Sequence, residues 1–354
     1  MRILNVADFN WMTGAERHSA RISLFDICRK FSLAATRADH LVVEFSDRAV
    51  ARMATPLRSR RLGAAAADRR FLQVADELRP DLILLHFADQ ISNGALAEAR
   101  RLAPGVTIAE INIDPIDTDK NRRRLAMRTG AVDALFVTTA EPALGRHAGP
   151  GSFAAYLPNP VDPSVETGRA FETDRPHFDL LLPVRGDASR PIGAESLAPS
   201  QAVAQLRGAL PGLRLSAPGT DGGPPADGVR YFDALASARI GWALSRANHR
   251  PLYASDRTAH MFGWGLVALV DRRVGFERFY ADDEAAFYAD FDDLTAVIRR
   301  LTADDALARE TARRGWEKTW RLFDSGRVLA YVLAQIFDEG GAKGCEWPCD
   351  RWRS

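Results

Sequence analysis

Short runs of apolar residues alternate with longer stretches of helical periodicity through the first half of the chain. Near-continuous apolar segments such as RILNV at 2–6, PDLILLHF at 80–87 and VTIAEINI at 106–113 are separated by amphipathic stretches, for example DRRFLQVADELR at 68–79. Strands that are apolar on both faces, with helices between them, are typical of a parallel sheet covered on both sides. The first half therefore predicts a doubly wound, Rossmann-like α/β domain.

The alternation stops at 163–177, a polar stretch flanked by prolines, and a second series of apolar runs follows it. FDLLLPVRG at 178–186, ARIGWALS at 238–245 and GLVALVD at 265–271 have the character of parallel strands, and FDDLTAVIRRL at 291–301 has that of a helix. We interpret 163–177 as an interdomain linker. The second half then predicts another α/β domain of the same kind.

The pattern sets the expected domain boundaries. We expect an N-terminal domain over 1–165, a C-terminal domain over 166–325, a final helix over 326–340 and a tail over 341–354. A length of 354 residues fits two domains of roughly 150 residues each. Ligands of such sheets bind beyond the carboxyl ends of the strands, so two sheets of this kind are expected to face a common cleft.

Composition narrows the class of protein. With 46% apolar residues, 26% charged residues and a net charge of +1, the chain has an ordinary globular composition and lacks the basic excess of a dedicated nucleic-acid binder. Cys28, Cys345 and Cys349 are too few for a disulfide framework. Neither a signal-peptide core nor an apolar run of about 18 residues is evident. We expect a cytoplasmic protein, with peripheral association at the inner face of a membrane left open.

An early turn suggests an anion site. The first predicted strand runs into FNWMTGAERH, in which Gly14 precedes a helical pattern. Glycine permits a sharp turn and the close approach of another molecule, and a helix N-terminus beyond it presents free N–H groups. Gly14 is thus a candidate for diphosphate binding, and an ordinary turn between a strand and a helix is the alternative.

Five stretches carry a resemblance to a known family. TGAERH at 13–18 resembles the turn that opens many GT-B glycosyltransferases, and PDLILLHF at 80–87, VDALFVTTA at 132–140 and YLPNPVD at 156–162 resemble successive strands of their N-terminal domain. The segment YASDRTAHMFGWGLVALVDRRVGFERFYADDEAAFYADFDDLTAVIRRL, at 253–301, resembles the group-1 glycosyltransferase segment of the spore-maturation type. The resemblance spans about residues 1–340 and is strongest in this last segment.

The resemblance implies a GT-B enzyme built from two Rossmann-like domains. Such an enzyme transfers a sugar from a nucleotide-sugar donor, held mainly by the C-terminal domain, to an acceptor on the N-terminal domain. It implies no cofactor and no obligatory metal. The last helix of the family packs back on the N-terminal domain, which suits RVLAYVLAQIF at 327–337. The acceptor class stays open among glycans, lipids and proteins.

The sequence departs from the family at one position pair. Many relatives carry two glutamates separated by seven residues, with the second glutamate on a helix ahead of a glycine. When Gly265 is aligned with that glycine, His260 takes the position of the second glutamate and Leu252 that of the first. Without the glutamate pair, neither recognition of the donor by that route nor retaining stereochemistry is implied.

The stretch SDRTAH supplies the main donor-binding candidates. Ser255 and Asp256 are residue types that cap helices, so the helix that follows is expected to point its N-terminus at the donor. Arg257 is a candidate to clamp a phosphate, and His260 lies one turn later on the same face. Tyr253 is a candidate to stack on the base. The alternatives are a simple helix cap, a surface salt bridge and an aromatic core residue.

Further candidates follow predicted strands. Arg185 and Gly186 come directly after the first strand of the second domain, and Gly219 follows LRLSAP at a comparable strand end. These are the expected places for loops that contact phosphate. Glu277 is a candidate to bind a sugar or ribose hydroxyl, with helix capping as the alternative.

The chemistry requires a base near the attacking hydroxyl. Asp114 ends a strand and precedes Pro115, which favours an exposed turn, and it is the leading candidate. His86, at the end of PDLILLH, and His18 are the alternatives.

Two rival functions remain open. Asp117 and Asp119 form an Asp-x-Asp triplet, a spacing that binds metal in a different glycosyltransferase fold. A metal-dependent transferase built on these residues is the first rival. A GT-B-shaped protein that binds a nucleotide sugar or glycan without catalysis is the second, because the glutamate pair is absent.

Overall fold

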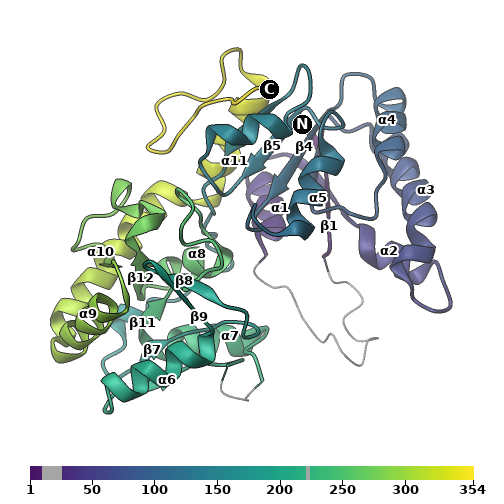
Figure 1. Ribbon diagram of the computed structural model, residues 1–354. Helices are drawn as coiled ribbons and strands as arrows, with labels where there is room; N and C mark the ends of the chain where they lie inside the picture. The colour runs from purple at the N-terminus through teal and green to yellow at the C-terminus, as the bar shows by residue number, and fades with distance from the viewer. Residues whose placement is uncertain (10–25, 221–223) are drawn as a thin grey trace. The chain divides into compact units, whose positions relative to one another are not determined.

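The chain folds into two compact units. The computed structural model describes residues 1–9, 26–220 and 224–354 (Figure 1). Unit 1 consists of 1–158 together with 325–354, and unit 2 consists of 159–324. The first unit thus ends seven residues before the boundary expected at 165, and the chain returns to it after the second unit is complete.

Unit 1 is built on a six-stranded sheet in which every pair of neighbouring strands is parallel. The strand order is β2-β1-β3-β4-β5-β6, so the order reverses between β1 and β3. The apolar runs of the sequence form these strands, which are β1 (Arg2–Ala7), β2 (Leu41–Ser46), β3 (Leu82–His86), β4 (Thr107–Asn112), β5 (Ala134–Val137) and β6 (Phe153–Tyr156). The doubly wound arrangement predicted from the sequence is confirmed.

Helices with one buried face cover this sheet. They are α1 (Ile27–Arg37), α2 (Asp47–Met53), α3 (Arg60–Leu78), α4 (Asn93–Leu102), α5 (Asp119–Arg128), the 3₁₀ helix η1 (Pro142–His147) and α11 (Ser325–Phe337). In α3 the small residues Gly63, Ala67 and Ala75 lie with Phe71 on the buried face. A Cβ atom on Gly63 would lie 1.8 Å from the backbone oxygen of Ala51, so α2 and α3 meet backbone to backbone.

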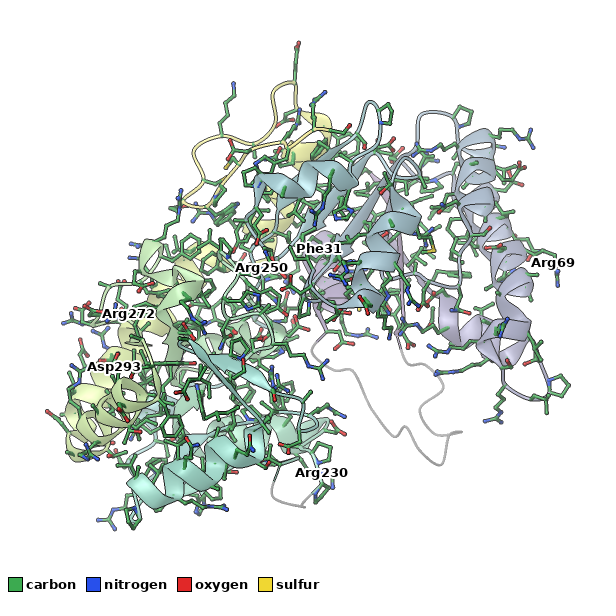
Figure 2. All side chains as sticks on the ribbon, in the orientation of Figure 1. Phe31, Arg69, Arg230, Arg250, Arg272 and Asp293 are labelled. Atoms are coloured by element: carbon green, nitrogen blue, oxygen red, sulfur yellow. The ribbon has the colours of Figure 1, made fainter. Side chains whose placement is uncertain are left out.

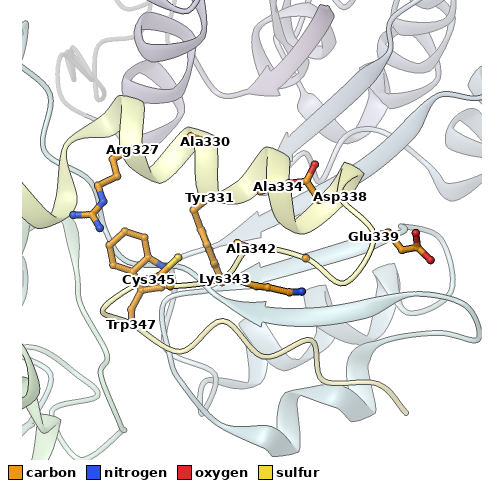
Figure 3. Close-up of a pocket in the computed structure, with 12 residues that line it drawn as sticks. Arg327, Ala330, Tyr331, Ala334, Asp338, Glu339, Ala342, Lys343, Cys345 and Trp347 are labelled. Carbon is orange, nitrogen blue, oxygen red and sulfur yellow. The ribbon is translucent and has the colours of Figure 1, made fainter.

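The last helix and the tail complete unit 1. In α11 the hydroxyl of Tyr331 donates a hydrogen bond of 2.7 Å to the backbone oxygen of Tyr156 in β6. The ring of Trp347 is buried edge-on against Tyr331, and Trp352 pairs antiparallel with Ala154. Figure 3 shows the pocket that the tail forms with α11, and none of the residues predicted to bind donor or acceptor lines it.

Unit 2 contains a five-stranded parallel sheet in the order β10-β7-β11-β12-β13. Its strands are β7 (Phe178–Leu181), β10 (Leu215–Ser216), β11 (Ala238–Trp242), β12 (Val267–Asp271) and β13 (Ala286–Tyr288). An antiparallel hairpin, β8 (Arg190–Ile192) and β9 (Glu195–Leu197), follows β7. The hairpin and β13 were not predicted, because each strand in them is only three residues long.

The helices of unit 2 pack their apolar faces on this sheet. They are α6 (Pro199–Ala209), α7 (Val229–Ala236), α8 (Asp256–Gly263), α9 (Phe291–Ala303) and α10 (Asp305–Phe323), with the 3₁₀ turns η2 (Ala170–Glu172), η3 (Arg272–Val274) and η4 (Phe276–Arg278). The core joins Trp242 and Leu269 of the sheet to Leu206, Ile298 and Ala312 of the helices.

The stretch 163–177 is not a linker, so that prediction was wrong. Val165 and Phe171 are buried in unit 2, and the N–H of Ala170 donates a 2.8 Å hydrogen bond to the backbone oxygen of Trp264. A Cβ atom on Gly168 would lie 2.0 Å from the Trp264 ring. The stretch is polar in composition, but its few apolar residues are buried and pack it against unit 2.

Candidate functional site

The order of strands marks a ligand-binding position in unit 2. From β7 the chain first adds β10 on one side and then β11 on the other, so the direction of winding reverses between β7 and β11. Ligands of open α/β sheets bind beyond the carboxyl ends of the strands at such a switch point. The loops that begin at Leu182 after β7 and at Ala243 after β11 therefore frame the candidate site.

Arg257 bridges these two loops. It lies in the first turn of α8, and its Nη1 donates to the backbone oxygen of Pro183 at 3.1 Å while its Nη2 donates to that of Leu244 at 3.3 Å. Ser255 takes the N-cap position of α8, but its side chain makes no capping hydrogen bond to the helix. The positive end of the helix and the guanidinium of Arg257 thus lie together at the switch point.

A second arginine, which the sequence analysis did not select, joins Arg257. Arg190 in β8 is 3% exposed, and it donates from Nη1 to Leu244 O and from Nη2 to Arg185 O, both at 3.3 Å. Its Nε is buried without a hydrogen-bond partner. Burial, followed by the nearby cations Arg257 and Arg246, lowers the pKa of Arg190 to about 9. It remains charged at neutral pH.

These cations form a group that we call the arginine cluster: Arg190, Arg246 and Arg257. In the part of the chain that the structure describes, no carboxylate lies within ion-pair distance of any of them. Burial also lowers the pKa of Arg257. Arg246 is exposed, whereas Arg190 is buried and Arg257 is partly buried. Withdrawing these two cations from water without a counter-ion costs free energy, which a bound anion would return. The arginine cluster therefore has the electrostatics of an anion site.

The loops around the arginine cluster are held by glycines and an ion pair. Gly219, beyond β10, has a φ of +88°, and a Cβ atom there would lie 2.5 Å from the backbone oxygen of Val184. Gly186 also has a positive φ, of +69°. The side chain of Arg185 is half exposed and pairs with Asp227. Gly186 and Gly219 thus shape the loops, and Arg185 reaches the cluster through its backbone oxygen.

The remaining donor candidates lie around α8 and beyond it. Tyr253 is buried, 5% exposed. Asp256 accepts a 2.8 Å hydrogen bond from Nδ2 of Asn159. Glu277 lies in η4 and pairs with Arg272, with Oε1 and Nη1 separated by 3.2 Å.

His260 points into the interior of unit 2. Its Nδ1 lies 2.5 Å from Oε1 of Glu166, and both side chains are almost completely buried. The other carboxylate oxygen of Glu166 accepts a 2.6 Å hydrogen bond from the N–H of Asp162. His260 thus pairs with a carboxylate 94 residues away in the chain, and no local pattern in the sequence indicates this contact.

Unit 1 holds the catalytic candidates that the structure describes. His86 ends β3 and is 5% exposed, and neither ring nitrogen has a hydrogen-bond partner. Burial lowers its pKa to about 3, so it is neutral above that pH. Asp114 follows β4 and is half exposed, with its Oδ2 2.8 Å from Nη1 of Arg124. Gly14 and His18 lie outside the described residues.

The triplet considered as a metal site begins a helix. Asp119 is the first residue of α5 and forms an ion pair with Arg122, while the hydroxyl of Thr118, between the two aspartates, caps the helix. Asp117 precedes that cap. Among the residues placed by the structure, no group of three or more His, Cys, Asp or Glu side chains is arranged to hold a metal ion.

No helix within 1–9, 26–220 or 224–354 combines the length and the apolar character needed to cross a bilayer.

Comparison with known proteins agrees with this architecture. Residues 196–334 match a family model described as glycosyl transferase-like. No curated protein sequence matches the chain. The matched region contains α8 and Arg257 but not Arg190.

Solved structures share the fold over nearly the whole chain. AviGT4, a glycosyltransferase involved in avilamycin A biosynthesis, is 15% identical with a TM-score of 0.59, over 95% of this chain and 97% of its own. Anabaena HepE, solved with UDP-glucose, is 12% identical with a TM-score of 0.58, over 94% and 99%. Sucrose-phosphate synthase of Thermosynechococcus elongatus is 12% identical with a TM-score of 0.57, over 94% and 97%. The chain therefore has the GT-B fold, with a glycosyl transferase-like region at 196–334.

Proposed function

We propose that this protein is a glycosyltransferase that takes a nucleotide-sugar donor and binds the donor diphosphate at the arginine cluster. The observation that carries the proposal is the placement of Arg190 and Arg257 at the switch point of unit 2, bonded to backbone oxygens and without a carboxylate partner among the residues that the structure describes. A diphosphate supplies the missing negative charge, and planar guanidinium groups suit its oxygens. The family match at 196–334 supports the same reading.

The arginine cluster would also assist the chemical step. When the bond between the sugar and the diphosphate breaks, negative charge grows on the leaving diphosphate. Fixed cations and the N–H groups at the start of α8 stabilise that charge without having to reorient. This role requires no divalent ion, and we propose that transfer is metal-independent.

Asp114 is the group that we propose as the base for the acceptor hydroxyl. It is half exposed at a strand end of unit 1. His86 is a weaker candidate, because it is only 5% exposed and an acceptor hydroxyl must come within hydrogen-bond reach of the base. The acceptor itself is a glycan, a lipid or a protein.

The decisive experiment measures donor binding and donor turnover in parallel. UDP-glucose is the first probe because it is bound in the HepE structure, and a panel of nucleotide sugars follows it. Binding to the folded state raises the melting temperature, and turnover releases the nucleoside diphosphate. Binding without hydrolysis or transfer for every donor would establish the non-catalytic alternative.

A chelator separates the proposed mechanism from the metal-dependent rival. We expect turnover to persist in excess EDTA, and the double variant Asp117→Asn, Asp119→Asn to lose far less activity than Asp114→Asn. Loss of turnover in EDTA, restored by Mn²⁺ or Mg²⁺, would contradict metal independence. Full activity of Asp114→Asn would exclude Asp114 as the base.

A further inference from the structure

An exposed apolar corner joins α2 to α3 in unit 1. Met53, Leu57 and Leu62 are 66%, 80% and 66% exposed, and they are the three most exposed large apolar side chains among the described residues. All three lie between positions 53 and 62. We call residues 52–70 the α2–α3 corner. Apolar side chains gathered in this way mark an interaction surface more often than single exposed ones do.

Hydrogen bonds and a close helix contact order the backbone of the corner. The hydroxyl of Thr55 accepts a 2.9 Å hydrogen bond from the N–H of Ser59, and the hydroxyl of Ser59 accepts one of 3.4 Å from Leu62 at the start of α3. The contact between Gly63 and Ala51 fixes α2 against α3. These contacts order the backbone of the corner, on which Leu57 and Leu62 are exposed.

The corner is also strongly basic. Between 52 and 70 the sequence has six arginines and one carboxylate, Asp68, which accepts a 2.8 Å hydrogen bond from the N–H of Ser92. Within the described residues, Arg60, Arg61 and Arg69 form no ion pair with a carboxylate. Figure 2 shows Arg69 pointing outward from α3.

Apolar and basic side chains are both exposed at the corner. Leu62, Ala65 and Arg69 recur at three- and four-residue intervals on the side of α3 opposite the buried Ala67 and Phe71, and Arg60 and Arg61 are exposed in the first turn of the helix, outside that face. A surface that combines arginines with exposed leucines matches the interface of an anionic bilayer, where arginines meet lipid phosphates and apolar side chains enter the boundary of the acyl chains. A nucleic acid would satisfy the arginines but would leave Leu57 and Leu62 in water.

We propose that the α2–α3 corner docks unit 1 on the surface of an anionic lipid membrane. An anionic membrane is the expected partner because the corner is basic and also exposes apolar side chains. This inference does not depend on the proposal that unit 2 binds a nucleotide sugar. α2 starts directly after β2, at the carboxyl edge of the unit 1 sheet, which is the edge that also carries His86 and Asp114. A membrane bound there lies on the side of the unit where the proposed acceptor base is found.

The test is co-sedimentation of the full chain with vesicles. We expect binding to vesicles of 30% phosphatidylglycerol in phosphatidylcholine, and little binding to phosphatidylcholine alone. The variant Arg60→Gln, Arg61→Gln should lower the partition coefficient about fivefold for each arginine removed. Leu57→Ser, Leu62→Ser should lower it at least about tenfold, because two apolar side chains no longer enter the interface. Leu57→Trp should show a blue shift in fluorescence on adding the anionic vesicles.

Matched variants in unit 2 serve as controls. Arg299 and Arg300 are exposed on α9, and Val229 is 62% exposed. Arg299→Gln, Arg300→Gln and Val229→Ser should bind vesicles like the wild type. The corner variants should keep the melting temperature and the UDP-glucose response of the wild type in lipid-free buffer, which separates this test from that of the donor site.

Three results would overturn the proposal. The first is no binding to anionic vesicles at low salt. The second is equal loss of binding in the control variants. The third is loss only in the arginine variant, with no effect of the leucine changes and no fluorescence shift, since that would indicate a purely electrostatic partner such as a nucleic acid.

Discussion

Both units bury arginines near the carboxyl edges of their sheets, but Arg48 and Arg128 of unit 1 have carboxylate partners, whereas in the described part of the chain Arg190 and Arg257 of unit 2 have none. In unit 1, Arg48 lies 3.0 Å from Asp89, measured from Nε to Oδ1. Arg128 lies 3.2 Å from Glu110, measured from Nε to Oε2, and both side chains are 2% exposed. Each of these cations already has its anion within the fold.

In unit 2 the arginine cluster has backbone oxygens where unit 1 has carboxylates. Arg190 is as buried as Arg128, yet it donates only to Leu244 O and Arg185 O. Backbone oxygens orient a guanidinium but do not neutralise it. A buried arginine that is paired with a carboxylate stabilises the fold, whereas a buried arginine that is bonded to backbone oxygens keeps its charge for a bound anion.

The largest expected effect is on stability. Arg128→Met should lower the free energy of unfolding by about 3–5 kcal/mol at pH 8, because Glu110 loses its counter-ion and must either stay buried as an unpaired charge or take up a proton. Arg190→Met should lower it by less than about 1 kcal/mol, because no carboxylate is left behind. Urea titration of both variants measures the difference.

The pH dependence and a double variant provide controls for that comparison. Burial raises the pKa of Glu110 to about 7, although Arg128 acts in the opposite direction. At pH 5.5 Glu110 is protonated, so the loss in Arg128→Met should shrink. The double variant Glu110→Met, Arg128→Met should recover most of the stability. Equal losses in Arg128→Met and Arg190→Met would show that the two arginines do not differ in kind.

The next effect is on donor affinity. Arg257→Met and Arg190→Met should each weaken binding of the cognate nucleotide sugar by about 1.5–3 kcal/mol, the range for a hydrogen bond to a charged group. Arg214→Met is the matched control, because Arg214 pairs with Asp179 and does not touch the cluster. Calorimetric titration gives the affinities. Unchanged affinity in both folded cluster variants would remove the arginine cluster from the donor site.

A third prediction concerns His86, the buried histidine of unit 1. Burial lowers the pKa of His86 to about 3, whereas the unfolded chain takes up the proton near 6.5. The contribution of neutral His86 to stability is therefore present above pH 6.5 and is lost as the pH falls, by about 2 kcal/mol between pH 7 and pH 5. His86→Leu should abolish this part of the pH dependence of the free energy of unfolding. Parallel stability–pH curves for wild type and variant would contradict the burial of His86.

The smallest expected effect is on a surface ion pair. Arg214 is half exposed and pairs with Asp179. Arg214→Gln should change the free energy of unfolding by less than about 1 kcal/mol, because solvent and salt screen such pairs. Its effect should vanish in 1 M NaCl, whereas the effect of Arg128→Met should persist. Urea titration at both salt concentrations measures the two.

The strands of both sheets could be predicted because their residues are apolar on both faces. Leu82–His86 and Val267–Asp271 are completely buried strands, and the sequence shows them as continuous apolar runs. The fold class followed from their alternation with helices. Arg257 could also be selected, since it follows two helix-capping residues and the N-terminus of a helix is where a phosphate binds.

Arg190 could not be selected in the same way. It begins the three-residue strand β8 in a polar stretch, five residues after Arg185, and it contacts the loop after β11, 54 residues further along the chain. The same reason explains the pairing of His260 with Glu166, 94 residues apart. Contacts of this separation are created by the fold and leave no local pattern in the sequence.

The division of unit 1 into two parts of the chain has a consequence for its synthesis. During translation, unit 2 emerges as one uninterrupted stretch, while unit 1 still lacks α11 and the tail that packs on β6. Domains fold as units during synthesis when their sequence is complete. Unit 2 can therefore complete its folding before unit 1 does. The surface of unit 1 that packs against α11 stays uncovered until residues 325–354 leave the exit tunnel.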